Sequence, residues 1–381
     1  MTARFHWFLP TAGDSRSLAV GTHGTHGPGE RAERAHEGGA DRFRAPDIGY
    51  LGLVARAVEQ LGFDAVLTPT GTWFEDAWLT TATLLHQTER LKFLVAFRPG
   101  LVSPTLTAQM AATFQRLSKG RLLLNVVAGG ESAEQARFGD YLSKDQRYAQ
   151  TGEFLTVLRG AWSGTPFDFK GEYYDVRGAT VSEPPNPLPT VYFGGSSDPA
   201  GVVAARHADV YLTWGEPPDQ VAQKIAWIRR LADEEGRRVR FGIRFHVISR
   251  DSSAEARTVA QRLLNKMDPA QVGKVQSVLA GIESTGQARQ RALTERFLSS
   301  RDSTDLEIYP NIWAGVGLLR GGVGTALVGS HVEVADRIEE YAALGIEEFI
   351  LSGFPHLEEA YWVGEGVLPE LRRRGLASAL Q

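Results

Sequence analysis

The chain has 381 residues and a formal net charge of −4, and its 43% hydrophobic and 23% charged residues are typical of a soluble globular protein. The mild acidity gives no electrostatic reason to expect nucleic acid or an anionic membrane as a partner. The absence of cysteine excludes disulfides, thiolate metal ligands and a cysteine nucleophile. No apolar run approaches a membrane span and the N-terminus lacks a secretory signal pattern, so we expect a cytoplasmic protein.

Short apolar runs alternate with helical patterns along the chain. The clearest helix is expected at 47–61, where apolar residues recur at three- and four-residue steps, Asp47 can cap the start and Gly62 can end it. Other helices are expected to start near Asp76, Pro104, Tyr148, Asp198, Pro217, Ser330 and His356. The expected strands are 4–9, 65–70, 91–97, 122–127, 190–195, 209–214, 240–248 and 347–353.

Eight strands that alternate with helices predict an α/β fold, a (β/α)8 TIM barrel with insertions. A doubly wound open sheet is the rival fold, but the glycine fingerprint expected after its first strand is missing, because residues 10–14 read PTAGD. We therefore expect residues 1–381 to form a single barrel domain. A barrel needs about 250 residues, so insertions are expected near 13–46, 163–189 (an extra hairpin) and 265–329.

The segment 298–324 is a candidate for a mobile lid. It is rich in glycine, follows a helical pattern and precedes the last barrel helix, so it can fold over the C-terminal mouth of the barrel. Long segments of this kind are usually functional or disordered. A disordered surface insertion is the alternative.

The expected strand 240–248 carries a guanidinium and an imidazole on one face. In FGIRFHVISR, Arg244 and His246 alternate with apolar residues, so the opposite face is wholly apolar. A desolvated charge is costly unless it is paired or meets a ligand. The pair favours an anion pocket, and a salt bridge with a buried carboxylate is the alternative.

The sequence FGGSSDPA leads from the expected strand 190–195 through Ser196 and Ser197 into a helix. Backbone N–H groups and hydroxyls at a helix N-terminus favour a phosphate. The structural alternative is a glycine turn in which Ser197 or Asp198 caps the helix. Phosphate sites in barrels lie on the loops of late strands, which favours the ligand.

Neither a metal site nor a serine hydrolase is supported by the sequence. His23, His26 and His36 lie in a glycine-rich loop without ligand spacing, and no G-x-S-x-G motif occurs. The residues alone therefore predict a barrel enzyme for an anionic small molecule, with a phosphate-bearing cofactor. They do not name the chemistry.

Several long sequence blocks identify a family. They extend from Phe5 to about Leu371 and include FHWFLPTAGD, TPTGTWFEDAW, VYFGGSSDPA, YLTWGEPP, FGIRFHVI, NIWAGVGLLRGGVGTALVG and LSGFPHLEEAY. They resemble the alkanesulfonate monooxygenases, a group of the bacterial-luciferase-like flavin-dependent oxygenases. The resemblance implies a two-component enzyme that receives reduced FMN (FMNH2) from a separate NAD(P)H-dependent FMN reductase. It would use O2 to cleave the C–S bond of an organosulfonate to sulfite and an aldehyde, and would be a homodimer or homotetramer.

The resemblance also implies roles for individual residues. Tyr148, Ser196 and Ser197 would hold the FMN phosphate, and Thr70 and Asn125 would line the isoalloxazine. The sulfonate pocket and the catalytic group would comprise Trp214, Arg244, His246, Arg301 and His356. Arg244 would pair with the sulfonate, because a guanidinium fits a multi-oxygen anion and stays charged. His246 would orient the substrate or shuttle a proton.

Three positions depart from the pattern of that family. Phe74 replaces a cysteine, Phe354 replaces a tyrosine and Ala12 replaces a histidine, and the loop 13–46 is longer than usual. All three changes fall in the expected pocket, so they predict a bulkier sulfonate or another organosulfur compound rather than a simple linear alkanesulfonate. The alternatives are a related monooxygenase of another anionic substrate, a deazaflavin-dependent hydride transfer, and a flavin-binding homologue without catalysis.

Overall fold

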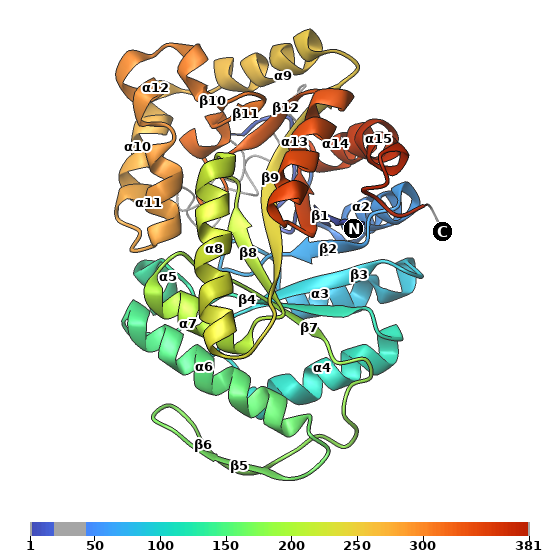
Figure 1. Cartoon of the computed structure of the whole chain (residues 1–381), viewed down its shortest axis with the longest axis vertical. Helices are drawn as coiled ribbons and strands as arrows, with labels where there is room; N and C mark the ends of the chain where they lie inside the picture. Colours follow the sequence, from blue (N-terminus) through green and yellow to red (C-terminus); the bar gives the residue numbers. More distant parts are fainter. Residues whose placement is uncertain (1, 19–42, 380–381) are drawn as a thin grey trace.

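The computed structural model describes residues 2–18 and 43–379. Within these residues, eight parallel strands close into a barrel, and β9 completes it by pairing with both β8 and β13 (Figure 1). They are β1 (Arg4–Phe8), β2 (Ala65–Thr68), β3 (Lys92–Phe97), β4 (Leu122–Val126), β7 (Thr190–Gly194), β8 (Val210–Trp214), β9 (Arg240–Arg250) and β13 (Glu348–Ser352). All eight expected strands are present, and the predicted (β/α)8 barrel is confirmed.

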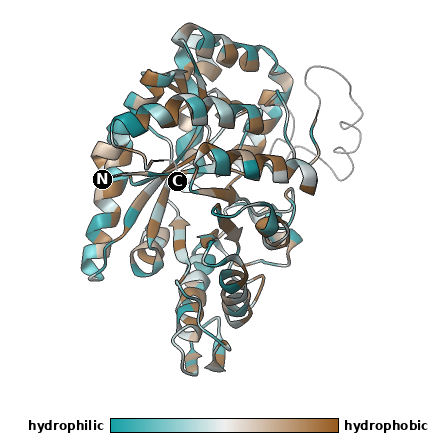
Figure 2. Cartoon of the chain, turned by 90° about the vertical axis from the view of Figure 1, so that its right-hand side faces the viewer, coloured by the Kyte–Doolittle hydropathy of each residue, from teal (hydrophilic) through white to brown (hydrophobic). Residues whose placement is uncertain are grey.

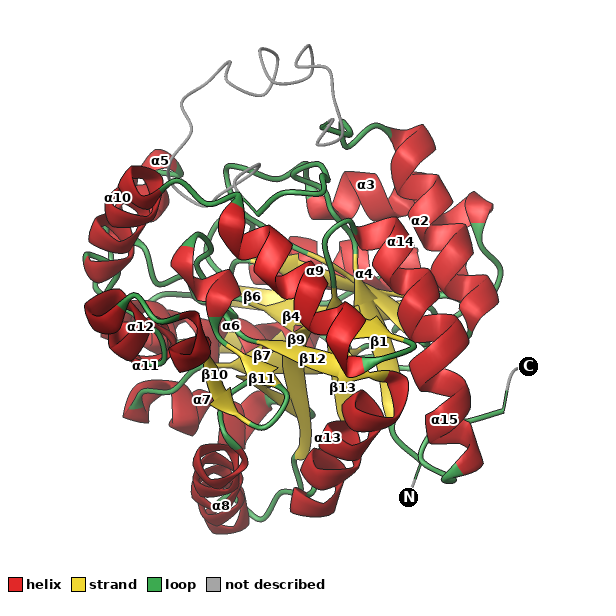
Figure 3. Ribbon diagram, turned by 90° about the horizontal axis from the view of Figure 1, so that it is seen from above, coloured by secondary structure: helices red, strands yellow, loops and turns green. Residues whose placement is uncertain are grey.

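Helices surround the barrel, as the view from above shows (Figure 3). They are α2 (Ile48–Leu61), α3 (Ala77–Leu84), α4 (Pro104–Ser118), α5 (Ser132–Arg137), α6 (Lys144–Ala161), α7 (Asp198–His207), α8 (Pro218–Glu234), α13 (His331–Leu344), α14 (His356–Trp362) and α15 (Leu368–Arg373). Helix α2 has the expected caps, since the Asp47 side chain accepts a hydrogen bond from the Tyr50 N–H and Gly62 adopts a φ of 87°. The helix expected near Tyr148 begins earlier because Ser143 forms a capping box ahead of α6.

Two insertions have secondary structure of their own. The hairpin expected in 163–189 is present as the antiparallel pair β5 (Phe167–Lys170) and β6 (Asp175–Ala179). Between β9 and α13 lie α9 (Ser253–Asn265), α10 (Pro269–Ala280), α11 (Thr285–Ala292), α12 (Glu295–Ser300), β10 (Glu307–Tyr309), β11 (Ile312–Trp313) and β12 (Ala326–Ser330). Strand β12 pairs in parallel with the second half of β9, so this insertion extends the barrel sheet.

The lid candidate 298–324 is folded, with a pair of short strands and two 3-10 turns. Leu306, Ile312 and Leu318 are fully buried in it. Gln276 on α10 donates hydrogen bonds to the carbonyls of Gly317 and Leu318 at 2.8 and 3.0 Å. Movement of this segment stays a prediction, and any movement would have to break these contacts.

The N-terminal insertion 13–46 is described only at its two ends. Asp14 and Arg44 form an antiparallel bridge there. His23, His26 and His36 lie outside the described residues. None of the helices that the structure describes is long and apolar enough to cross a membrane.

Strand β9 follows the expected alternation. Its residues Phe241, Ile243 and Phe245 are at most 3% exposed and pack outward, in the large core between the barrel and its helices. Arg244 and His246 point to the other face, which is the barrel interior. The hydropathy colouring shows helices in which hydrophilic and hydrophobic residues are mixed (Figure 2).

A buried polar network closes the N-terminal end of the barrel. Glu348 is fully buried and contacts His6 Nε2 at 2.9 Å, the Tyr192 hydroxyl at 2.5 Å and the Arg240 guanidinium. Burial raises the pKa of this carboxyl, but the hydrogen bond and charge of His6 and the charge of Arg240 outweigh it and lower the pKa to about 2. The network joins four barrel strands at the end opposite the expected site.

Candidate active site

A cavity of about 370 Å³ lies at the C-terminal ends of the barrel strands, where TIM-barrel sites are found. Most of the predicted site residues line it, although they come from strands and loops far apart in the sequence. These residues are Thr70, Phe74, Asn125, Tyr148, Ser196, Ser197, Trp214, Arg244, His246, Phe354 and His356, and Ala12 lies beside them.

Arg301 is the predicted site residue that the structure does not bring to the cavity. It ends α12 with a φ of 62°, and its side chain is exposed. The insertion instead presents Arg320 to the cavity. The resemblance located Arg301 by its place in the sequence, but the fold of the insertion directs that residue to the surface.

The loop between β7 and α7 forms a narrow corner of the cavity. A Cβ on Gly195 would lie only 2.5 Å from Ala200 Cβ and 3.3 Å from the Tyr148 hydroxyl oxygen, so only glycine fits. Ser197 Oγ is buried and makes no hydrogen bond of standard geometry with the described residues. Burial raises the pKa of the Tyr148 phenol, which keeps it a neutral donor. Unsatisfied donors at the start of α7 fit a phosphate group such as that of FMN.

Ser197→Ala is expected to weaken FMN binding about tenfold, because a hydrogen bond to a charged group contributes about 1.5–3 kcal/mol. The folding stability of the protein without ligand should change little, since the hydroxyl makes no hydrogen bond of standard geometry with the described residues. Flavin fluorescence titration measures the first effect and thermal unfolding the second. Ser277→Ala, on an exposed face of α10, is the control. Unchanged FMN affinity in Ser197→Ala would contradict the phosphate assignment.

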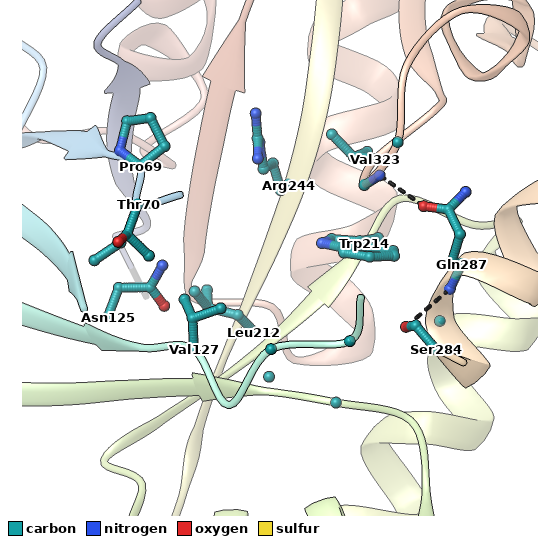
Figure 4. A pocket seen from close by; sticks show the side chains of 18 of the residues that line it. Pro69, Thr70, Asn125, Val127, Leu212, Trp214, Arg244, Ser284, Gln287 and Val323 are labelled. Atoms are coloured by element: carbon teal, nitrogen blue, oxygen red, sulfur yellow. Dashed lines mark hydrogen bonds between the residues drawn. The ribbon is translucent and has the colours of Figure 1, made fainter. Parts of the chain in front are cut away.

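The cavity has polar side chains on one wall and an aromatic side chain on the opposite wall. Figure 4 shows Thr70 and Asn125 on one side, Trp214 on the other, and Arg244 between them. Helix α11 packs closely on Trp214, because a Cβ on Gly286 would lie 3.2 Å from the indole. Polar and apolar side chains thus enclose a space that a flat ring system could occupy.

Helix α11 also fixes the segment that carries Arg320. Gln287 accepts a hydrogen bond from the Gly322 N–H at 2.8 Å, and its own N–H donates to Ser284 Oγ at 3.2 Å (Figure 4). The Gly324 N–H donates to Gln290 at 2.8 Å. The insertion therefore contributes a defined wall of the cavity.

Arg244 is held in the cavity without a carboxylate partner. Its guanidinium carbon lies 4.4 Å from the Phe8 ring centroid, and its Nε is buried with no hydrogen-bond partner among the described residues. Among residues 2–18 and 43–379, no carboxylate forms an ion pair with Arg244. The salt bridge that the sequence left as the alternative is therefore not observed within these residues. Burial and the nearby charge of Arg320 lower the pKa of Arg244 to about 10, which leaves it charged at neutral pH.

Arg320 is a cavity residue that the sequence reasoning missed. Its guanidinium carbon lies 4.7 Å from the Phe354 ring centroid. Burial lowers its pKa to about 10, partly opposed by the charge of Asp14. The sequence RGGVG marks the position, since glycines often accompany backbone that approaches a ligand. Two cations now face the same region of the cavity.

Both ring nitrogens of His246 have hydrogen-bond partners. Its Nε2 lies 3.3 Å from the Val323 carbonyl oxygen and its Nδ1 lies 2.8 Å from Ser352 Oγ. Because a carbonyl only accepts, Nε2 carries the proton and Nδ1 accepts from Ser352. Burial, and then the charge of Arg244, hold the pKa of His246 well below its ordinary value. A neutral ring with both nitrogens bonded is poorly suited to proton transfer, which favours the orienting role, and both roles stay predictions.

His356 forms a pair with a carboxylate that the sequence reasoning missed. Asp14 accepts from the His356 backbone N–H at 2.8 Å and lies 3.0 Å from Nδ1. The Asp14 carboxylate is 2% exposed and also accepts from the Tyr50 hydroxyl. His356 Nε2 has no hydrogen-bond partner in the described part of the chain, and the residue lines the cavity.

Another missed pair joins Arg98, directly after β3, to Glu134 in α5. Arg98 donates to Glu134 at 2.5 Å, and Glu134 accepts from the Thr72 N–H at 2.9 Å. Both side chains are at most 6% exposed, and each residue lines the cavity. Their charges compensate each other, so the uncompensated positive charge lies on the Arg244 side. The described residues hold no group of three His, Asp or Glu that could bind a metal.

The model of a family described as luciferase-like monooxygenase matches residues 4–348. The chain belongs to this family. Riboflavin lyase (RcaE), solved with modified FMN and its substrate riboflavin, has 21% identity and a TM-score of 0.78 over 99% of this chain and 93% of its own. EDTA monooxygenase (EmoA) from Chelativorans sp. BNC1 has 18% identity and a TM-score of 0.75 over 100% and 96%. DmoA from Hyphomicrobium sulfonivorans has 22% identity and a TM-score of 0.75 over 99% and 89%.

This luciferase-like monooxygenase thus has the fold of flavin-dependent monooxygenases over its whole length. The identities are low, so the likeness to these structures concerns the fold alone. The chemistry specific to this member of the family depends on its own cavity, with the corner formed by Gly195 and Ser197 before α7 and the wall that carries Arg244 and Arg320.

Proposed function

We propose that the protein is a two-component monooxygenase that uses reduced FMN and O2 to cleave the C–S bond of an organosulfonate. The observation that carries the proposal is Arg244, a guanidinium in the cavity with no carboxylate partner among the described residues. A charge kept in such a place is costly unless a ligand compensates it. A sulfonate offers three oxygens to a planar fork of donors, which suits arginine better than lysine.

The reaction balances without a further reactant. A sulfonate R–CH2–SO3⁻, O2 and FMNH2 give R–CHO, bisulfite, water and FMN, so one oxygen atom enters the aldehyde and the other leaves in water. When bound, the cofactor supplies two electrons and activates O2. Ser196, Ser197 and Tyr148 would hold its phosphate, and Thr70 and Asn125 would line its ring.

The residues of the chain bind and orient the substrate. Arg244 and Arg320 neutralise the sulfonate before the bond breaks and the departing sulfite afterwards. His246 fixes the Val323 segment against β13 through its two hydrogen bonds. Trp214 and Phe354 exclude water from the reacting carbon. His356, with Nε2 free of described partners, is the group that can move a proton at the cavity.

Sulfite release tests the proposal. The assay contains the protein, a flavin reductase, NADH, FMN and O2, with a panel of sulfonates from methane- to octanesulfonate plus sugar and aromatic members. We expect sulfite from at least one member, dependent on the protein and on O2. Absence of sulfite across the panel, with FMN still bound tightly, would contradict the proposal. Conversion of a substrate without oxygen consumption, in a parallel assay with a reduced deazaflavin in place of FMN, would instead indicate hydride transfer.

Phe354 favours a second candidate, a luciferase-like monooxygenase of another organosulfur or anionic compound. Its ring contacts His246 and His356 at centroid distances of 5.2 and 5.0 Å, in the middle of the polar wall. A phenyl ring there removes the donor that the resemblance predicts, and Phe74 adds bulk. Including sulfones and thioethers in the same oxygen-dependent assay separates this candidate from the first.

The proposed reaction also requires a partner that reduces FMN. A separate NAD(P)H-dependent FMN reductase would supply the reduced cofactor, and the chain would form a homodimer or homotetramer. Exposed leucines such as Leu53 on α2 and Leu79 on α3, 50% and 72% exposed, are available for contact with a second copy. Light scattering determines the oligomeric state, and NADH oxidation with and without reductase tests the two-component arrangement.

A further inference from the structure

The loop after β1 and the start of α14 meet at one buried contact. The two residues that make it, Asp14 and His356, are 342 positions apart in the sequence. Each oxygen of the carboxylate has a defined donor: Oδ1 lies 3.0 Å from His356 Nδ1, and Oδ2 accepts from the His356 backbone N–H at 2.8 Å and from the Tyr50 hydroxyl. We propose that Asp14 is the positioning residue that fixes the tautomer and orientation of His356, so that Nε2 serves the reaction.

The hydrogen-bond inventory determines the tautomer. The charge and hydrogen bonds of His356 hold the pKa of Asp14 below its ordinary value, although burial alone would raise it. An ionised carboxylate has no proton to donate, so Nδ1 must carry the hydrogen of that bond. The neutral ring therefore presents Nε2 as an acceptor. A charged carboxylate also stabilises the ring once it accepts a proton.

The Asp14 carboxylate contacts a His356 ring that is otherwise flanked by aromatic side chains. Phe8 and Phe354 flank the ring at centroid distances of 5.5 and 5.0 Å, so water has little access. The charged and titratable groups around the pair are Arg244, His246 and Arg320 in the cavity wall, and Arg44, Tyr50, Glu358 and Glu359 behind Asp14. Asp14 is the carboxylate in direct contact with the ring. Glu358 is paired with Arg44, and Glu359 with Arg250.

Asp14 also connects the site to the N-terminal insertion. Its backbone forms a β-bridge with Arg44. The Tyr50 hydroxyl, which donates a hydrogen bond to Asp14, also accepts one from the Arg44 guanidinium at 3.2 Å. The position of His356 therefore depends on the contact between the two described ends of this insertion. This inference rests on the proposed function for its catalytic readout.

A double-mutant cycle tests the inference. Asp14→Asn keeps the shape, but an amide has a single acceptor oxygen, so Nδ1 loses its charged partner. We expect about a hundredfold lower kcat, unchanged FMN affinity, and an acidic limb of the pH–rate profile about one unit lower, because the carboxylate favours the protonated ring. In a His356→Gln background the same substitution should cost nothing, since it acts only through the ring. An equal loss of kcat in both backgrounds would overturn the inference.

A measurement on the unaltered protein tests the inference even if Asp14→Asn does not fold. With ¹⁵N-labelled histidine, the resonance of His356, assigned from His356→Gln, should show the proton on Nδ1 in the neutral ring. A proton on Nε2 would overturn the inference. This readout needs no substrate, so it decides the role of Asp14 even if no sulfonate is turned over. Glu348→Gln, which alters a similar carboxylate–histidine pair at the far end of the barrel, should leave both the resonance and the pH profile unchanged.

Discussion

Replacing Arg244 by methionine is expected to lower kcat/KM for the anionic substrate by about 10³-fold, while FMN affinity changes less than about threefold. The cause is the loss of a bidentate, charge-assisted contact in a cavity with little water, where each such hydrogen bond is worth about 1.5–3 kcal/mol. Methionine fills a similar volume, so the Phe8 ring keeps a neighbour. Steady-state kinetics and flavin titration measure the two quantities.

The same variant should be more stable than the natural protein. Arg244 Nε has no hydrogen-bond partner in the described part of the chain, and removing a charge from such a site relieves a desolvation cost. We expect the free energy of unfolding to rise by about 1 kcal/mol. Arg257→Met on the exposed face of α9 is the matched control and should change neither quantity. Lost activity together with lost stability would indicate that Arg244 is structural.

Glu348→Gln is expected to lower the free energy of unfolding by about 3 kcal/mol at neutral pH, because it removes the negative partner of a buried charged network. His6 and Arg240 would then share the barrel end without a carboxylate. Turnover per folded molecule should stay the same, since the network lies at the opposite end from the cavity. Denaturant unfolding followed by circular dichroism gives the stability difference.

The pH dependence of the unfolding free energy shows whether the Glu348 carboxylate is responsible for this stabilisation. Its pKa is lowered from 4.5 to about 2 in the folded protein, so its stabilisation is complete above pH 4.5 and is lost as the pH falls towards 2. The stability difference between the natural protein and Glu348→Gln should therefore shrink across this window. Glu234→Gln, which breaks an exposed pair with Arg230, should cost well under 1 kcal/mol at any pH. A difference independent of pH would show that packing, and not charge, stabilises this end.

The strands and the cavity face of β9 could be predicted from local pattern. Alternation along β9 places Arg244 and His246 together, and this requires no knowledge of other strands. Asp47 and Gly62 bound α2 for equally local reasons. The start of α6 was misplaced because its capping box at Ser143 lies outside the apolar periodicity that indicated the helix.

Contacts between distant segments could not be predicted in this way. Asp14 is one acid among many in the sequence, and only barrel closure brings it to His356. Arg301 and Arg320 both lie in the insertion. The sequence indicated only Arg301, because the fold of the insertion decides that Arg301 ends α12 at the surface and that Arg320 lines the cavity. The pairing of Arg98 with Glu134 likewise depends on the approach of the end of β3 to α5.

Strand β9 pairs with two different strands along one of its edges. Residues 240–244 pair with β8 of the barrel, and residues 246–250 pair with β12 of the insertion. Arg244 and His246 occupy the junction itself. Variation in the insertion can therefore change the surroundings of Arg244 and His246, while the barrel strands keep their register. Divergence of substrate range among relatives of this protein should be concentrated in residues 265–329 rather than in the strands.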